Sequence, residues 1–140
     1  MRIESVGDGM SISVDDMGNA IAEMLSEYQV EVTKKIDESS KAVANQGAKK
    51  LKETSPKTPK GGNYAKSWKA EKTSGKNVGE DPAYTIYNKN HYRLTHLLEH
   101  GHATPNGGRT RAIKHIQPVE QAVIMDYENA VEEAIKNATE

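Results

Sequence analysis

The sequence predicts an α+β protein in which a small antiparallel sheet packs against a long N-terminal helix and a C-terminal helix. Apolar residues recur every three or four positions before Pro56 and again after Pro118, which is the period of an amphipathic helix. Between these stretches, residues 83–87 have the composition and alternation of a strand, and turn residues separate them from their neighbours. The chain has 140 residues, so we expect a single domain over positions 1–140.

The N-terminal helix is predicted over about residues 15–53. A short strand over residues 10–14 precedes it, and Ser13 or Asp15 can cap its first turn. A helix of this length spans roughly 55 Å at about 1.5 Å per residue. A compact domain of this size is under ~40 Å across. We therefore expect the helix either to break near residues 45–47 or to project from the domain and bind a partner. Its apolar stripe comprises Met17, Ile21, Met24, Leu25, Tyr28, Val32, Ile36, Val43 and Leu51.

The sheet and a short helix are predicted within about residues 63–116. A first strand ends near Lys72, and the second strand places Tyr84 and Ile86 on one face. A short helix over 91–100 is expected to stop at Gly101.

A Gly-rich loop follows, and then the final helix, over about residues 118–138. Pro118 is placed at the first helical position, where its missing N–H has no partner to lose. The predicted apolar stripe of this helix comprises Val119, Val123, Tyr127, Ala130, Val131 and Ala134.

Composition narrows the classes of function. Hydrophobic residues make up 35% of the chain, with one Trp and no Phe, so the core is mostly aliphatic and partner subunits can contribute to stability. There is no cysteine, which fits a reducing cytoplasm and excludes a thiolate metal cage. No stretch approaches the ~18 apolar residues of a membrane span, so we expect no membrane partner.

The net charge of −1 hides a division along the chain. Residues 49–114 hold 14 Lys or Arg against 5 Asp or Glu, a net of +9. The remaining residues hold 5 basic against 15 acidic side chains, a net of −10. Such a division indicates either a nucleic-acid surface or a subunit whose basic part meets the acidic part of its neighbour.

The segment His96-Leu-Leu-Glu-His100 matches the inverted zinc-peptidase signature H-x-x-E-H. On a helix, however, Leu94, Leu97 and Leu98 define the apolar face, and both histidines and Glu99 fall on the opposite side. A catalytic zinc also needs a third protein ligand and a sheltered cleft. We interpret this segment as a solvated polar face, and we expect no enzyme activity, cofactor or metal. A small zinc hydrolase is the weakest of the alternatives.

A nucleic-acid-binding module is the stronger alternative. Nine lysines occur within residues 49–76, with Tyr64 and Trp68 among them, which mixes charge with rings that could stack on bases. Since the chain has only one Trp and no Phe, the core needs Trp68. We therefore expect Trp68 to be buried and its neighbouring lysines to be ordinary surface.

Several blocks together resemble the head–tail joining, or neck, family of long-tailed phages and prophages, whose members are also called minor tail components. The blocks are SPKTPKGGNYAKSW, YTIYN, YRLTHLLEHGH and HIQP, in that order, with a Gly-rich basic loop before the last. One departure is the segment from Thr58 to Gly62, where relatives often have Thr-Gly, so the turn geometry there can differ.

The resemblance implies an α+β fold, no catalytic activity and a place in the virion neck or tail after assembly in the host cytoplasm. It implies a structural corner in which Leu98 packs inward, Glu99 bonds backbone or a basic residue, and Gly101 takes a left-handed stop. The full set of structural residues is Trp68, Leu98, Glu99, Gly101, His102, His115 and Pro118.

The same resemblance implies a ring around the DNA channel, with neighbouring head-closure and tail proteins as further partners. DNA passes nearby, but no sequence-specific binding to it is expected. A ring needs two different surfaces of each subunit to meet, and a basic surface facing an acidic one would steer that contact. The candidates for the assembly loop are Arg109, Arg111 and Lys114.

Overall fold

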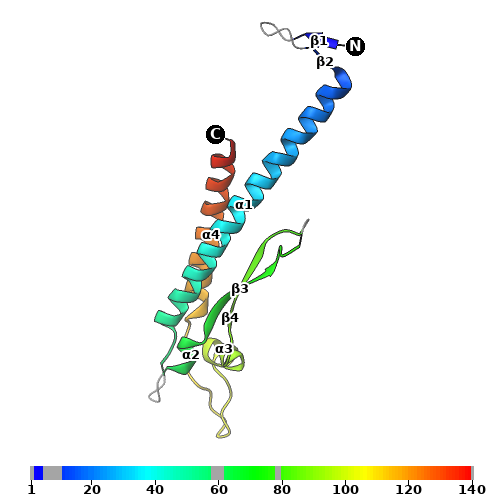
Figure 1. The fold of residues 1–140 in the computed structure, drawn as a ribbon. Helices are drawn as coiled ribbons and strands as arrows, with labels where there is room; N and C mark the ends of the chain where they lie inside the picture. The colour runs from blue at the N-terminus through cyan, green and yellow to red at the C-terminus, as the bar shows by residue number, and fades with distance from the viewer. Residues whose placement is uncertain (1, 5–10, 58–61, 78–79, 140) are drawn as a thin grey trace.

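The computed structural model describes residues 2–4, 11–57, 62–77 and 80–139, and it confirms the predicted α+β class. Figure 1 shows an elongated molecule built on two long helices, with a β-hairpin and a short helix at one end. The elements in chain order are β1 (Arg2–Glu4), β2 (Ser11–Ser13), α1 (Val14–Thr54), α2 (Asn63–Lys66), β3 (Trp68–Ser74), β4 (Ala83–Asn88), α3 (Tyr92–His100) and α4 (Ile116–Thr139).

Helix α1 is one continuous helix of 41 residues, about 60 Å long at 1.5 Å per residue. Ser13 caps it, since its Oγ accepts a hydrogen bond from the Asp16 N–H at 3.0 Å. The helix ends where the Ser55 N–H bonds the carbonyl of Leu51 at 2.9 Å. Its N-terminal part extends away from the other helices, so the expected projection from the domain is confirmed (Figure 1).

The alternative of a break near residues 45–47 is wrong, and Gly47 shows why. A Cβ at Gly47 would lie 2.7 Å from both Ile86 Cδ1 and Val123 Cγ2. The glycine therefore lets β4 and α4 approach α1 closely. A glycine in the middle of an isolated helix would weaken it by about 1 kcal/mol relative to Ala. At Gly47, packing of β4 and α4 against the helix keeps it continuous.

Strands β3 and β4 form an antiparallel pair from Trp68↔Asn88 to Lys72↔Tyr84, with an irregularity between Lys72 and Ser74. Tyr84 and Ile86 are half-buried on one face, as predicted. The Tyr84 hydroxyl donates to Asp37 Oδ1 at 2.8 Å, which ties the hairpin to α1. A second antiparallel pair, β1 with β2, precedes α1, so there are two small sheets where the sequence predicted one.

Helix α4 runs back along α1 in the opposite direction (Figure 1). It begins at Ile116, so Pro118 is its third residue. The sequence prediction, which placed Pro118 at the first helical position, is wrong by two residues. The predicted stripe is buried or half-buried at Val119, Val123 and Ala134, whereas Tyr127 is exposed.

The core lies where α1, α2, β3 and α4 meet. Its buried apolar members are Leu51, Tyr64, Trp68 and Val119, with Ile86, Leu98, Ile116 and Val123 packed against them. In the described parts of the chain, no helix is long and apolar enough to cross a membrane.

Candidate functional site

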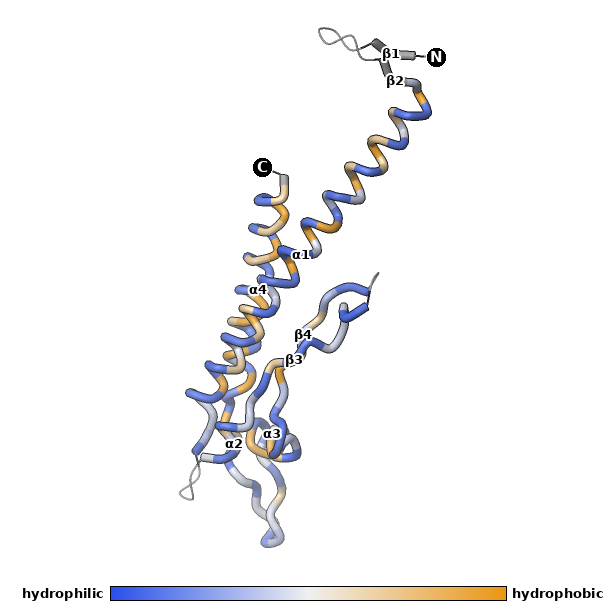
Figure 2. The backbone as a smooth tube through the Cα atoms, viewed as in Figure 1, coloured by the Kyte–Doolittle hydropathy of each residue, from blue (hydrophilic) through white to orange (hydrophobic). Residues whose placement is uncertain are grey.

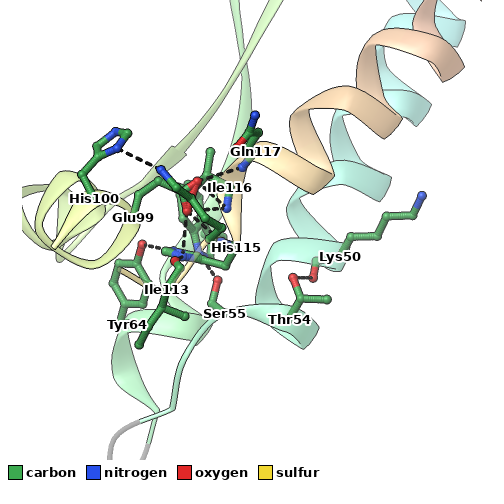
Figure 3. Close-up of polar contacts among 12 residues, drawn as sticks. Lys50, Thr54, Ser55, Tyr64, Glu99, His100, Ile113, His115, Ile116 and Gln117 are labelled. Carbon is green, nitrogen blue, oxygen red and sulfur yellow. Dashed lines mark hydrogen bonds and ion pairs between the residues drawn. The ribbon is translucent and has the colours of Figure 1, made fainter. Parts of the chain in front are cut away.

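The C-terminal turn of α3 points a buried carboxylate at the first turn of α4. Glu99 is only 5% exposed. Its Oε1 accepts from the backbone N–H of His115 at 2.7 Å and of Ile116 at 3.0 Å, and its Oε2 accepts from Gln117 N–H at 2.9 Å (Figure 3). The next residue, Pro118, has no N–H to satisfy. Glu99 therefore caps α4 from a different helix.

These donors also set the charge state of Glu99. Burial raises the pKa of Glu99, but the backbone N–H groups of Ile116, Gln117 and His115 lower it more, so the pKa lies below its ordinary value. The positive end of the α4 dipole acts in the same direction. Glu99 is thus held as an anion in a buried position.

The predicted orientation of α3 is wrong for Glu99. The helical period placed Glu99 on the solvated side with the histidines, and placed Leu94 and Leu97 inward. In the structure Leu94 and Leu97 are 38% and 40% exposed, and only Leu98 of the three leucines packs against the core. A pattern of hydrophobicity could not anticipate that the start of α4 supplies a buried carboxylate with hydrogen-bond partners.

His115 connects Glu99 to the aromatic core. It is 4% exposed, and both ring nitrogens have partners. Nδ1 lies 2.7 Å from the carbonyl oxygen of Ile113, to which it donates, and Nε2 lies 2.7 Å from the hydroxyl of Tyr64. Nδ1 is also 3.2 Å from Glu99 Oε1. Burial and the charge of Glu99 raise the pKa of Tyr64 to about 12, so its hydroxyl stays protonated while it hydrogen-bonds His115 Nε2.

Trp68 lies on the other side of Tyr64. The two rings meet edge to face with centroids 5.8 Å apart, and the Trp68 Nε1–H donates to Ser55 Oγ at 2.8 Å. Both aromatic residues are buried, as expected for Trp68. Neither ring is available to stack on a base, which removes the aromatic half of the nucleic-acid hypothesis.

Asn88 and Ser55 are two members of the junction that the sequence analysis missed. The Asn88 amide donates to the carbonyl of Tyr64 at 2.8 Å and its Oδ1 accepts from the N–H of His91 at 2.9 Å, joining β4 to α2 and to the start of α3. Asn88 ends β4 four residues before the first residue of α3, and an Asn side chain readily accepts from a backbone N–H a few positions on. That spacing was the available signal. For Ser55 the sequence offered none.

Gly101 follows His100, the last residue of α3, with φ 71° and ψ 168°. The positive φ was expected, but the left-handed helical stop is wrong, because this ψ belongs to an extended region that essentially only glycine adopts. A Cβ there would lie 2.5 Å from the Thr110 carbonyl oxygen. The close approach brings the loop back against α3.

The loop after Gly101 folds as a short hairpin. The Thr110 N–H bonds the His102 carbonyl at 2.8 Å, and Thr104 N–H bonds the Gly108 carbonyl at 2.8 Å. His102 Nδ1 lies 3.0 Å from Thr110 Oγ1, so this histidine acts as a loop hydrogen-bonder.

The candidates for the assembly loop lie on the outside of this hairpin and beside α3. All three are exposed. Arg109 donates a long hydrogen bond of 3.4 Å to the Gly101 carbonyl, and Lys114 Nζ lies 3.1 Å from His100 Nδ1. Arg111 has an exposed guanidinium between them along the chain.

The H-x-x-E-H segment is not arranged as a zinc site. The His96 and His100 rings stack at 6.4 Å on the exposed side of α3, whereas the Glu99 carboxylate faces α4. Among the residues that the structure describes, no three potential ligands come together to hold a metal. The chemistry of the junction is structural: the buried Glu99 carboxylate and the buried His115 ring hold α2, α3 and α4 together.

Comparison with known proteins places this architecture in a family. A family model described as "Bacteriophage HK97-gp10, putative tail-component" matches residues 19–101, more than half of the chain. The match runs from the first turns of α1 through Gly101, and thus includes Trp68, Leu98 and Glu99 but not the basic hairpin. No curated protein and no solved structure is significantly similar to the chain. The chain belongs to the HK97-gp10-like family of bacteriophage tail components.

Proposed function

We propose that this protein is a structural part of the phage neck that joins the head connector to the tail as a ring around the DNA channel. It is made in the host cytoplasm and enters the virion during assembly. Its partners are other copies of itself and the neighbouring head-closure and tail proteins. Family membership supports a virion role, and the shape of the subunit supports the more specific one.

The observation that carries the proposal is the uncovered N-terminal part of α1. Every residue from 21 to 31 is exposed, including Met24 at 67% and Leu25 at 62%. Figure 2 shows apolar positions recurring along this projecting part of the helix. A regular apolar stripe without a covering element is typical of a surface that becomes buried on assembly.

The buried junction supports a non-enzymic role. The carboxylate of Glu99 is saturated by backbone donors, and His115 and Tyr64 bond each other inside the core. These are the groups that general acid–base chemistry would need to expose to a substrate. We therefore propose a protein that works by holding a shape and presenting surfaces.

The proposal is tested by reversing the hairpin charges with Arg109→Glu and Arg111→Glu in the phage that encodes the protein. Both side chains are exposed, so the circular dichroism spectrum should be unchanged. The expected phenotype is filled heads and finished tails that stay separate, seen by electron microscopy, with infectious yield reduced at least about a hundredfold because like charges would meet at the contact.

The matched control is Lys66→Glu with Lys69→Glu, two exposed cations outside the hairpin that give the same change in net charge. This control should assemble normally. Normal yield from the hairpin reversal would contradict an assembly role for the hairpin. Equal loss from both pairs would show a response to overall charge and would likewise remove the hairpin from the proposal.

A further inference from the structure

The exposed residues of the projecting helix combine apolar and acidic character. We call residues 14–33 the α1 overhang. Ile21, Met24, Leu25 and Tyr28 lie at helical spacing and are all exposed. The overhang has five carboxylates, Asp15, Asp16, Glu23, Glu27 and Glu31, and no Lys or Arg. At 100° per residue, Glu27 and Glu31 border one edge of this apolar stripe, so a partner that covers the stripe gains from positive charge beside its apolar contacts.

The opposite end of the same molecule carries such a surface. Exposed apolar side chains on and beside α3 are accompanied by exposed cations, and we call this set the α3 surface: Tyr92, Arg93, Leu94, Leu97, Arg111 and Ile113.

The segment after the hairpin is held against α3, because Ile113 N–H bonds the Leu98 carbonyl at 2.7 Å and Lys114 bonds His100. Residues 89–114 contain five Lys or Arg and a single acidic residue, Glu99. That acid is buried, so the charges presented outward in this region are positive.

The two surfaces cannot meet within one chain. The overhang lies at the N-terminal end of α1, and α3 lies near the C-terminal end of α1 (Figure 1). The two surfaces are therefore separated by most of the length of α1, which is about 60 Å long. Their lengths match between molecules, since residues 21–28 span about 12 Å and the nine residues of α3 about 14 Å.

We infer that the α1 overhang of one copy docks on the α3 surface of the next copy. The inference rests on the proposed function as a self-assembling neck component and names the contact that builds the ring. Because two different surfaces meet, the contact is heterologous and can close into a ring. Pairing of two overhangs would bring ten carboxylates together, which like-charge repulsion opposes.

The absence of cysteine allows a direct cross-linking test. Ser26→Cys lies on the overhang and Ala112→Cys lies between Arg111 and Ile113, and both positions are exposed. A mixture of the two purified full-length variants, treated with a short bis-maleimide, should give peptides joined between positions 26 and 112. Either variant alone should give no cross-link. A chain carrying both changes should give a ladder of cross-linked oligomers.

Charge reversal tests the specificity of the contact. Glu23→Lys with Glu27→Lys in the Ser26→Cys chain, or Arg93→Glu with Arg111→Glu in the Ala112→Cys chain, should each lower the cross-linked yield at least about tenfold. Mixing the two reversed chains should restore it, because opposite charges again face each other. Glu132→Lys with Glu133→Lys, on the exposed side of α4, is the control and should change nothing.

Three outcomes would overturn the inference. Cross-linking of the Ser26→Cys variant alone would mean that two overhangs pair. No product from any mixture would mean that copies do not meet through these surfaces. Position 26 cross-linked in virions to a different protein would assign the overhang to that partner. Each of these leaves the proposed function standing, whereas absence of the chain from virions would remove the proposed function whatever the cross-links show.

Discussion

At the scale of single residues, Glu99 holds the end of α3 against the start of α4. Its carboxylate accepts hydrogen bonds from the backbone N–H groups of His115, Ile116 and Gln117. Among the described residues, no other acceptor is seen for these three N–H groups. Replacing it by Gln keeps the size but puts an N–H₂ group against N–H donors. Because the site is buried, unpaired donors there cannot turn to water.

We expect Glu99→Gln to lower the free energy of unfolding by about 2–3 kcal/mol, measured by urea denaturation. Glu120→Gln, at an exposed position on α4, should change it by less than about 0.5 kcal/mol. Equal effects from the two variants would contradict the capping role of Glu99.

The same residue predicts how stability depends on pH. The pKa of Glu99 is lowered in the folded protein from an ordinary value of 4.5. A lowered pKa contributes stability that is fully present above the ordinary value and is lost as the pH falls through the folded one. The midpoint of thermal unfolding should therefore fall as the pH drops below the ordinary value of 4.5, and fall less steeply in Glu99→Gln. Parallel curves for the two proteins would contradict this assignment.

The exposed histidine pair gives a third prediction at this scale. His96 and His100 stack on the surface of α3 without the carboxylate that the signature would require beside them. Elemental analysis of the purified protein after dialysis should find no stoichiometric zinc. One zinc per chain, lost in a His96→Ala and His100→Ala double variant, would overturn our account of the HLLEH segment.

At the scale of elements, the two glycines of α1 offer a matched comparison. Gly18 has open space around its Cα, whereas Gly47 sits between Ile86 and Val123. Gly18→Ala should stabilise the protein by about 0.5–1 kcal/mol through helix propensity. In Gly47→Ala, the added methyl group would clash with Val123, whose β-branched side chain has few other rotamers. We expect this overpacking to destabilise the protein by about 1–3 kcal/mol, which offsets or exceeds the gain from helix propensity. Thermal denaturation of both variants checks the sign, and equal stabilisation would contradict the close approach of the three elements.

The order of helices and strands along the chain could be predicted, because each of them is specified by residues close together in the sequence. The period of α1, the Ser13 cap and the strand at residues 83–88 all act within a few positions, and the structure follows them closely. Where the start of α4 was misplaced, the cause was a distant residue. Pro118 marks a helix start by local rules, but Glu99 supplies partners two residues earlier and extends the helix to Ile116.

The candidate site was predictable only in part, for the same physical reason. Trp68 was expected inside because the composition left few other large residues for a core. The partners of Tyr64, Ser55 and Asn88 are set by tertiary contacts between segments 13 to 51 positions apart. No periodicity in a single segment reports such contacts.

At the scale of the whole molecule, the structure shows where the acidic and basic parts of the sequence lie. The α1 overhang carries only acidic charge, α4 has more acidic than basic residues, and the basic hairpin lies toward the end occupied by α3 (Figure 1). A subunit with unlike ends favours contacts between different surfaces over contacts between identical ones. This arrangement is the physical basis for proposing a ring.

The most direct test of that claim is cryo-electron microscopy of purified virions from the phage that encodes this protein. We predict density at the neck, between head connector and tail, into which several copies of the subunit fit as a closed ring. The α1 overhang of each copy should lie against α3 of the next. Virions that lack the chain, or that carry it only as single copies away from the neck, would contradict the proposed ring.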